Sequence, residues 1–252
     1  MERIVRPEWP AGYTLRSNYA RMWYSDHRIP FLDFLAMRTA AAILSLASPM
    51  SGAWIEIGCG PGGLLPTFLR AAELVAGVDI DMPSVQDAAI LTRFMSGSSC
   101  ALRASAYTTP FRDSSFDGVV AVETLEHLDA EPVAREIRRI LKPGGKLVFS
   151  APVEIGSALL VRQALRRLMR LKCSNFSPMV YPLADLVGMV TGRDKILHRL
   201  KRKASNFDHA YFSYRVLLDE LAKWMKFETF RWSPFPIRGP WTFSITGVAT
   251  KR

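Results

Sequence analysis

The sequence is poor in cysteine and has no long uninterrupted apolar run, and these absences exclude several classes of protein. Its 252 residues include three cysteines, at positions 59, 100 and 173, without C-x-x-C spacing. This number and spacing exclude a disulfide framework and a cysteine-rich zinc site, and they favour a reducing compartment. The longest apolar stretch, residues 34–50, contains Arg38 and is shorter than the ~20 residues that span a bilayer.

The N-terminus and the charge distribution add to this description. Residues 1–10 are charged and contain proline, without the apolar core of a signal peptide. We therefore expect a soluble, cytoplasmic protein, with peripheral contact at the inner membrane surface as an alternative.

Residues 153–204 hold eleven Lys or Arg residues against three acidic ones, so this segment alone carries +8 of the net charge of +10. The basicity is local, and we expect this segment to be an insertion in a single domain.

Short apolar segments alternate with amphipathic ones after residue 50, which predicts an α/β fold with a parallel sheet covered on both faces. The predicted strands are 53–57, 74–80, 100–105, 116–122 and a fifth within 141–152 that opens after a Pro-Gly turn. The predicted helices are 31–48, 62–74, 84–95, 130–141 and 212–227, with Asp129 and Ser213 as N-caps. Two last strands, 227–232 and 241–250, have no helix between them, which predicts an antiparallel pair.

A glycine-rich turn follows the first of these strands, in the stretch "WIEIGCGPGG" at residues 54–63. Gly58, Gly60 and Gly63 satisfy the pattern G-x-G-x-x-G, and Asp79 follows about twenty residues later, as in dinucleotide-binding folds. Glycines let the backbone approach a ligand closely, and the following helix N-terminus offers free N–H groups. The pattern therefore predicts a binding loop.

Two residues of this stretch disfavour a dinucleotide. Pro61 removes one backbone donor that a pyrophosphate would use. Glu56 places a carboxylate at the end of the strand, where it would repel a phosphate and attract an ammonium group. A ligand with a cationic amino group and no phosphate fits better, and S-adenosylmethionine is such a ligand.

Four stretches carry a resemblance to a known family, in this order and spacing: "IEIGCGPGG", "GVDID", "FDGVVAVETLEHL" and "LKPGGKLVFSAP". They resemble the class I S-adenosylmethionine-dependent methyltransferases, and within them the small-molecule, type 11 group that includes enzymes of quinone biosynthesis. The resemblance implies a Rossmann-like seven-stranded, mostly parallel sheet with helices on both faces and an antiparallel last strand, here with a basic helical insertion. It also implies methyl transfer from S-adenosylmethionine to a small-molecule or lipid-linked acceptor, by in-line displacement in which positioning is the main catalytic device.

The resemblance also assigns roles to individual residues. Glu56, Gly58 and Gly60 would hold the methionine end of the cofactor, Asp79 would bind the ribose hydroxyls, and Ile80 would pack on the adenine. Ser105 stands where the family often has an aspartate on the adenine amino group, so a weaker bond is expected there. The complete set expected to bind the cofactor is Glu56, Gly58, Cys59, Gly60, Asp79, Ile80, Ser105, Ala106 and Val122.

A catalytic residue is not determined by the sequence. Glu123, Glu126 and His127 have i, i+3, i+4 spacing, so on a helix they would share one face. They could supply a base or bind a divalent cation, but we favour a structural role for Glu126 and His127 at a helix start and expect no metal. His209 and Tyr211 are further candidates, and a surface or helix-entry role is the preferred interpretation for His209.

The insertion contains a basic amphipathic pattern over residues 159–172. Its apolar positions are Val161, Ala164, Leu165, Leu168 and Leu171, and Arg162, Arg166 and Arg170 follow beside them. A second basic run covers 195–203. This pattern suits a lid over the active site, which residues 1–48 would also cover as an N-terminal helical segment, or an anionic membrane surface.

Two other functions stay open at this point. RNA methylation is less favoured, because the insertion offers only Phe176 and Tyr181 for base stacking. The chain also has "VETL" where relatives that methylate nucleobase amino groups carry an Asn/Asp-Pro-Pro-Tyr motif. A non-catalytic scaffold that binds a partner through the insertion is the remaining alternative. The acceptor atom and the oligomeric state are not indicated by the sequence.

Overall fold

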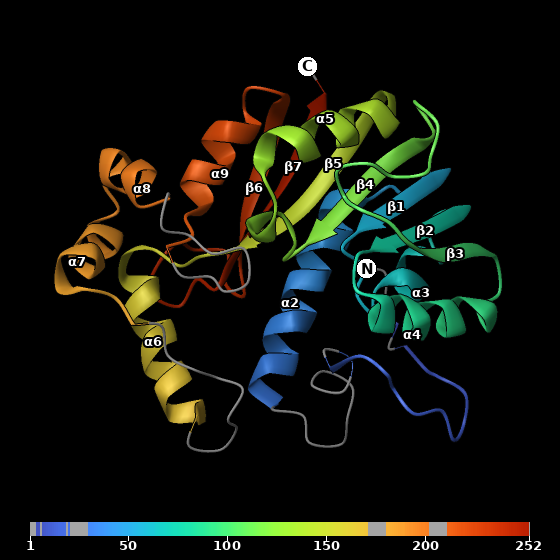
Figure 1. Ribbon diagram of the computed structural model, residues 1–252, viewed down its shortest axis with the longest axis horizontal. Coiled ribbons are helices and arrows are strands. Elements are labelled where there is room, and N and C mark those ends of the chain that lie inside the picture. The colour runs from blue at the N-terminus through green and yellow to red at the C-terminus, as the bar shows by residue number, and fades with distance from the viewer. Residues whose placement is uncertain are drawn as a thin grey trace.

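The computed structural model describes residues 4–5, 7–18, 20, 30–170, 180–201 and 211–251, and these fold around one seven-stranded sheet (Figure 1). The strand order is β3-β2-β1-β4-β5-β7-β6. The strands are β1 (Ala53–Ile57), β2 (Leu74–Asp79), β3 (Ser98–Arg103), β4 (Phe116–Val122), β5 (Leu141–Pro152), β6 (Met225–Ser233) and β7 (Ser244–Lys251). Strands β1 to β5 pair in parallel, whereas β7 is antiparallel to both β5 and β6.

Helices cover both faces of this sheet (Figure 1). On one face, α2 (Pro30–Ala47) and α3 (Leu65–Phe68) pack into a core that includes Trp54 of β1. On the other face, α5 (Ala130–Ile140) and α9 (Tyr214–Leu221) pack into a core that includes Ile55. Successive side chains of a strand point to opposite faces, so one short strand contributes to both cores. Helix α4 (Met82–Arg93) packs along β3 and β2.

The segment between β5 and α9 contains three further helices: α6 (Gly156–Arg170), α7 (Leu183–Thr191) and α8 (Asp194–Leu200). They lie beside the sheet at the β6 side of the molecule (Figure 1). Among the described helices, α6 to α8 included, none combines the length and apolar character needed to cross a bilayer. Leu171, Lys172, Phe176, His209 and the end of the second basic run at 202–203 lie outside the described residues.

The predicted fold class is confirmed, including the antiparallel last strand, but two predicted helices are wrong in extent. The predicted helix 62–74 is reduced to Leu65–Phe68, because Gly62 adopts φ +83° before it and the chain turns back toward β2 after it. The predicted helix 212–227 ends at Leu221, and Met225 already belongs to β6. Ser213 and Asp129 occupy N-cap positions, but neither side chain accepts a capping hydrogen bond.

Candidate cofactor and acceptor site

The glycine turn after β1 bends sharply over the end of β2. Gly58 has φ +72° and Gly60 has φ +51°, both in the left-handed region that favours glycine. The N–H groups of Gly58 and Cys59 donate to the carbonyl oxygen of Val78 at 2.8 and 3.0 Å. A Cβ atom on Gly58 would lie 2.4 Å from Thr124 Cγ2. The turn therefore requires glycine for both its conformation and its close packing.

Cys59 contributes to this turn through its backbone. Its side chain is buried against β2, where a Cβ atom on Gly77 would lie 2.8 Å from the Cys59 Sγ. Burial raises the pKa of the Cys59 thiol well above its usual range, and the charges of Glu56 and Asp79 raise it further. The thiol is therefore neutral and packs as a small apolar group.

Glu56 is a buried carboxylate at the end of β1. Its Oε2 atom has no hydrogen-bond partner in the described part of the chain. Burial, together with the nearby charge of Asp79, raises the pKa of Glu56 well above its usual value. A buried, unpaired carboxylate is costly, and a cationic ligand group beside it would offset that cost. The geometry thus fits the ammonium end of S-adenosylmethionine.

Asp79 connects the end of β2 to the glycine turn. Its Oδ2 accepts a hydrogen bond from Gly60 N at 2.8 Å, and its Oδ1 accepts one from Asp81 N at 2.9 Å. Each carboxylate oxygen has a second lone pair for a ligand hydroxyl. Ile80 follows directly and is 63% exposed, so it offers an apolar surface to a flat ring. Both positions fit the predicted ribose and adenine contacts, which stay predictions.

The loop between β3 and β4 carries the predicted adenine contacts. Ser105 Oγ already accepts a hydrogen bond from Tyr107 N at 3.2 Å, and Ala106 is half-buried. Ala104 N donates to the carbonyl oxygen of Asp79 at 3.0 Å, which fixes this loop beside the end of β2. Val122, at the end of β4, is half-buried near the same edge of the sheet.

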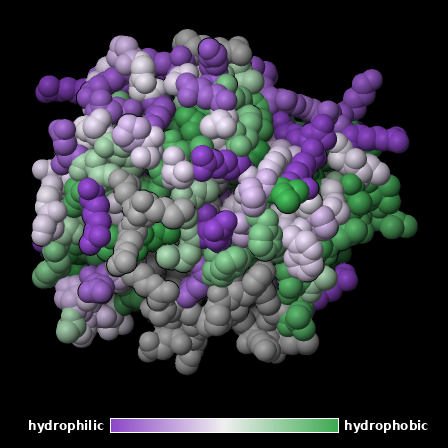
Figure 2. Space-filling model, turned by 180° about the vertical axis from the view of Figure 1, so that it is seen from behind, coloured by the Kyte–Doolittle hydropathy of each residue, from purple (hydrophilic) through white to green (hydrophobic). Residues whose placement is uncertain are grey.

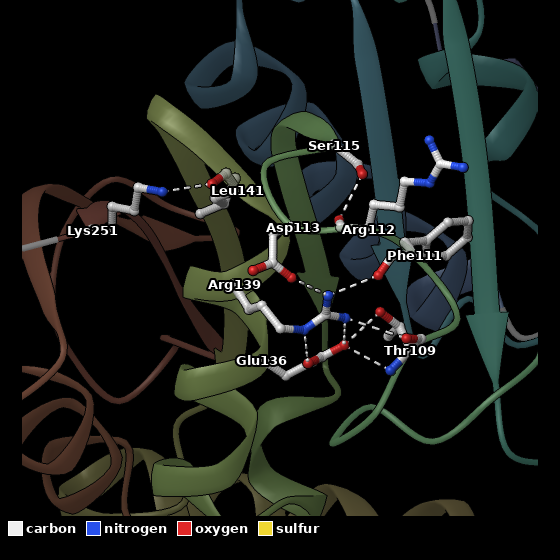
Figure 3. A network of polar contacts seen from close by, with 9 residues as sticks. All are labelled: Thr109, Phe111, Arg112, Asp113, Ser115, Glu136, Arg139, Leu141 and Lys251. Carbon is white, nitrogen blue, oxygen red and sulfur yellow. Dashed lines mark hydrogen bonds and ion pairs between the residues drawn. The ribbon is translucent and has the colours of Figure 1, made fainter.

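A polar network around the buried Glu136, which sequence reasoning missed, holds this loop against α5 (Figure 3). Thr109 donates to Glu136 Oε1 through both its N–H and its hydroxyl, each at 2.6 Å. Arg139 donates to Glu136 Oε1, to Asp113 Oδ1 and to the carbonyl oxygen of Phe111 at 2.7, 2.7 and 2.8 Å. Burial would raise the pKa of Glu136, but the hydrogen bonds from Arg139 and Thr109 outweigh it and lower that pKa. Nothing in the sequence marks these residues except the i, i+3 spacing of Glu136 and Arg139.

The N-terminal segment is fixed to α4 by Asp87, which is fully buried. Its carboxylate accepts hydrogen bonds from Tyr13 Oη at 2.8 Å and from the backbone N–H groups of Arg16 and Ser17 at 2.9 Å each. The Asp87 carbonyl oxygen accepts one more from Trp9 Nε1 at 3.0 Å. The described residues 7–18 therefore lie along the helix that follows Asp79. Whether residues 1–48 cover the active site stays a prediction.

The end of β4 carries a strained residue, Glu123, with φ +47°. Its N–H donates to Ser150 Oγ at 3.0 Å, and the Ser150 hydroxyl donates to Glu123 Oε1 at 2.9 Å. A non-glycine residue in this region of backbone space is costly and often marks a functional site. The bonds to β5 hold it in place.

Glu126 lies in a short 3-10 helix, η1 (Leu125–His127), just after this residue. Both of its carboxylate oxygens are buried, and neither has a hydrogen-bond partner among the described residues. Burial raises the pKa of Glu126 well above its usual value, and the charge of Glu123 raises it further, while Arg162 acts in the opposite direction. His127 is partly exposed, with Nε2 3.9 Å from Glu126 Oε1.

The remaining candidates from the sequence are a metal site and the residues Tyr211 and His209. Within the described ranges, no three His, Cys, Asp or Glu side chains are grouped so that they could hold a metal ion. Tyr211 donates its hydroxyl to Asp185 Oδ2 at 3.0 Å, which ties the start of α9 to α7. His209 lies outside the described residues.

A buried ion cluster attaches α6 to the end of β5. Glu154 is fully buried, and its Oε1 accepts from Arg162 Nε at 2.8 Å and from Arg166 Nη2 at 2.6 Å. Arg162 also donates to the carbonyl oxygen of Phe243 at 2.6 Å. Arg162 and Arg166 therefore do not form an exposed basic face on α6, because both side chains turn inward to a carboxylate that the periodicity of the helix does not reveal.

A cavity of about 280 Å³ opens beside this cluster. Residues from the end of β5, the start of α6, the start of α9 and the β6–β7 connection line it: Val153, Ile155, Gly156, Tyr214, Arg238 and Thr242. Ligands on parallel sheets bind beyond the carboxyl ends of the strands. The cavity lies beyond the carboxyl end of β5. The contribution of the β6–β7 connection was not predicted.

Comparison with known proteins gives a consistent result. Residues 55–149 match the family described as "Methyltransferase domain". The chain is 33% identical over 99 residues to the ubiquinone biosynthesis O-methyltransferase of Idiomarina loihiensis, a match that covers 38% of this chain and 40% of that protein. It is 29% identical over 100 residues to the O-methyltransferase resE of Aspergillus sclerotiorum, with 38% of each chain covered. The chain thus matches less than half the length of either relative.

Solved structures show the same fold over nearly the whole chain. The PH0226 protein of Pyrococcus horikoshii OT3 has a TM-score of 0.62 at 17% identity, with 94% of this chain and 99% of that chain covered. The family match runs from β1 into β5, and so includes the glycine turn, Asp79 and the strained end of β4. Residues 55–149 thus match a methyltransferase domain, and the fold of the chain is similar to that of solved S-adenosylmethionine-dependent methyltransferases.

Proposed function

We propose that this chain methylates an oxygen atom of a small-molecule or lipid-linked acceptor, with Glu126 as the group that takes the proton from the acceptor. The observation that carries the proposal is the buried Glu126 carboxylate, whose two oxygens have no hydrogen-bond partner in the described part of the molecule. The relatives named O-methyltransferases support an oxygen acceptor.

Residues at the ends of β1 and β2 would hold the cofactor. Glu56 would pair with its ammonium group, Asp79 would accept hydrogen bonds from the ribose hydroxyls, and Ile80 would pack against the adenine ring. When bound there, S-adenosylmethionine supplies an electrophilic methyl group on a sulfonium. The chain's own task is then to hold the acceptor in line with that methyl group and to remove its proton.

Glu126 is suited to the second task by its surroundings. It lies one turn beyond the end of β4, in the field of Arg162, which belongs to the cluster that attaches α6. A carboxylate in such a buried position has a raised pKa, which brings its basicity closer to that of an acceptor hydroxyl. Val153 and Ile155, the neighbours of Glu154, line the cavity, and Glu154 is one of the charges that act on Glu126, so we place the acceptor in this cavity.

The first test concerns the cofactor. Calorimetry with S-adenosylhomocysteine should show binding by the purified protein, and Glu56→Gln should weaken it by about 100-fold, because a buried charge pair is lost. Glu73→Gln replaces an exposed carboxylate just before β2, at the opposite edge of the sheet; it is the control and should bind as the wild type does. Absence of binding by the wild type would overturn the cofactor assignment.

The second test concerns the acceptor. Methyl-labelled S-adenosylmethionine is supplied with lipid, polar small-molecule and RNA extracts, and label is expected in an ether or ester of the first two fractions. Label in RNA would support the alternative of an RNA methyltransferase. Cofactor binding without transfer to any fraction would support a non-catalytic scaffold.

A further inference from the structure

The outward face of the α6–α7 helix pair is apolar. Five large aliphatic side chains on and between these helices are 48–89% exposed: Leu160, Leu168, Val180, Leu183 and Val187. Leu160 and Leu168 are two turns apart on α6, with the exposed Ala164 between them. The predicted apolar stripe of α6 is therefore partly turned to solvent, and among the residues of α6 whose burial is described, 156–168, the buried ones are Ala158, Leu159 and Gln163.

A shallow groove joins the two helices on this face. It encloses about 250 Å³ and is lined by Leu160, Gln163, Ala164, Arg167, Val180, Tyr181 and Leu186. Figure 2, which views the molecule from behind, shows hydrophobic surface at the edge where α6 and α7 lie, with hydrophilic side chains beside it. Exposed apolar patches rimmed by charge mark interaction sites more often than scattered apolar residues do.

The charge beside this face has one sign. Arg167, Arg193, Lys195 and Arg199 are exposed, and the described residues form no ion pair with any of them. The three acidic residues of the insertion are already engaged. Glu154 is buried between Arg162 and Arg166, Asp185 accepts from Tyr211, and Asp194 pairs with Arg215 at 2.8 Å.

We infer that this face docks on an anionic lipid bilayer. Its aliphatic side chains would enter the interfacial region while the four cations contact lipid phosphates, the arrangement of interfacial amphipathic helices. Charge complementarity selects this occupant. A second copy of the chain would bring like charges together. The described residues of this face offer a nucleic acid one half-buried aromatic ring, Tyr181, for base stacking.

Docking of this kind would place the acceptor cavity near the lipid surface. Helix α6 begins at Gly156, which lines that cavity, and continues into the apolar face. The inference goes beyond the proposed function, because it assigns a membrane contact that methyl transfer does not itself require. The membrane contact can therefore be refuted without refuting the proposed methyl transfer.

The test is co-sedimentation of the full chain with vesicles, without cofactor. Vesicles of phosphatidylglycerol mixed into phosphatidylcholine should bind the protein, and pure phosphatidylcholine should bind it much more weakly. The double variant Lys195→Glu with Arg199→Glu should lose about 25-fold in affinity or more, since each surface charge contributes about fivefold. Leu183→Asp should lose about 10- to 100-fold through its apolar burial.

The matched control lies at the other side of the sheet. Arg93 and Phe94 are an exposed cation and an exposed apolar residue at the end of α4, and Arg93→Glu with Phe94→Asp should leave vesicle binding unchanged. All variants should bind S-adenosylhomocysteine as the wild type does, which separates this test from that of the proposed function. If Leu183→Asp unfolds the protein, the double variant Lys195→Glu with Arg199→Glu still tests whether vesicle binding depends on this face.

Three results would overturn the inference. One is equal sedimentation of the wild type and the charge variant. Another is a dimer in light scattering that Leu183→Asp or the charge variant dissociates, which would identify a second copy as the occupant. The third is that the protein binds RNA and not vesicles, and that this RNA binding depends on Lys195 and Arg199.

Discussion

The two halves of the candidate site, at the carboxyl ends of the parallel strands, are built by different means. Around the ends of β1 and β2, the backbone sets the shape: Gly58 N and Cys59 N bond to Val78 O, and Gly60 N bonds to Asp79. Around the ends of β4 and β5, side-chain charges set the shape of the site. The charged residues there come from η1, from the segment after β5 and from α6, and they surround the buried Glu154. A site formed by backbone turns depends on local conformation, whereas a site formed by buried charges depends on each charge having a partner of opposite sign.

This difference predicts that a substitution in one half of the site impairs the property of that half and leaves the other half intact. A change in the charge cluster should affect the acceptor side and the stability of α6, with cofactor affinity preserved. A change in the loop that carries the predicted adenine contacts should affect cofactor affinity and leave the chemical step intact. Three substitutions test this separation.

The largest expected effect is on turnover, from Glu126→Gln. As the proposed base, Glu126 should contribute about 10²–10⁴-fold to kcat, and the variant should lose that factor while its affinity for S-adenosylhomocysteine stays the same. The rate of the wild type should rise with pH through the raised pKa of Glu126, because the base acts when deprotonated. This rise should be absent from the variant.

Two observations would count against this assignment. One is an unchanged pH profile in Glu126→Gln. The other is a loss of the same size in His127→Asn, since His127 is partly exposed and 3.9 Å from the carboxylate. Stability gives an independent check, because a buried carboxyl with a raised pKa stabilises the fold below its unfolded pKa, and this stabilisation is lost as pH rises through the folded pKa. At high pH the glutamine variant should therefore unfold at higher urea concentration than the wild type.

The second effect is on stability, from Glu154→Ala. Removal of this fully buried carboxylate leaves Arg162 and Arg166 facing one another without a counter-charge, which should cost about 3–5 kcal/mol in the free energy of unfolding. Hydrogen exchange should increase first in α6. The matched control is Glu131→Ala, which breaks the exposed i, i+4 pair with Arg135 and should cost no more than about 0.5 kcal/mol. Equal costs in urea titrations would show that the buried cluster does not hold α6.

The same difference explains how much of the molecule the sequence predicts. The strands, the glycine turn and the positions of Glu56 and Asp79 follow from short patterns, since each is set within a few residues of its neighbours. The orientation of Arg162 and Arg166 does not follow from them. Their helical spacing is equally compatible with solvent, and the partner that turns them inward, Glu154, precedes the helix and entered the sequence analysis only as one of three acidic residues in the segment.

The predicted helix after the glycine turn fails for a related reason. Its apolar residues suggested a helix over 62–74, but Leu65, Phe68 and Ala72 are buried by turns that pack on β2 rather than by one continuous helix. In a buried segment, apolar spacing does not distinguish a helix from successive turns. The network around Arg139 was missed because hydrogen bonds between a loop and a distant helix leave no periodic pattern.

The smallest expected effect is on cofactor affinity, from Thr109→Val. This substitution keeps the volume of the buried side chain and removes the hydroxyl that donates to Glu136 Oε1 at 2.6 Å, while Thr109 N and Arg139 still hold that carboxylate. The β3–β4 loop should loosen by about 1 kcal/mol, so S-adenosylhomocysteine should bind up to about fivefold more weakly, with kcat unchanged. Thr92→Val is the matched control, because its buried hydroxyl donates to Ala89 O within α4, away from the loop. If Thr92→Val weakens binding by the same factor, or if Thr109→Val lowers kcat instead of affinity, the β3–β4 loop does not act on the cofactor side alone and the separation of the two halves is wrong.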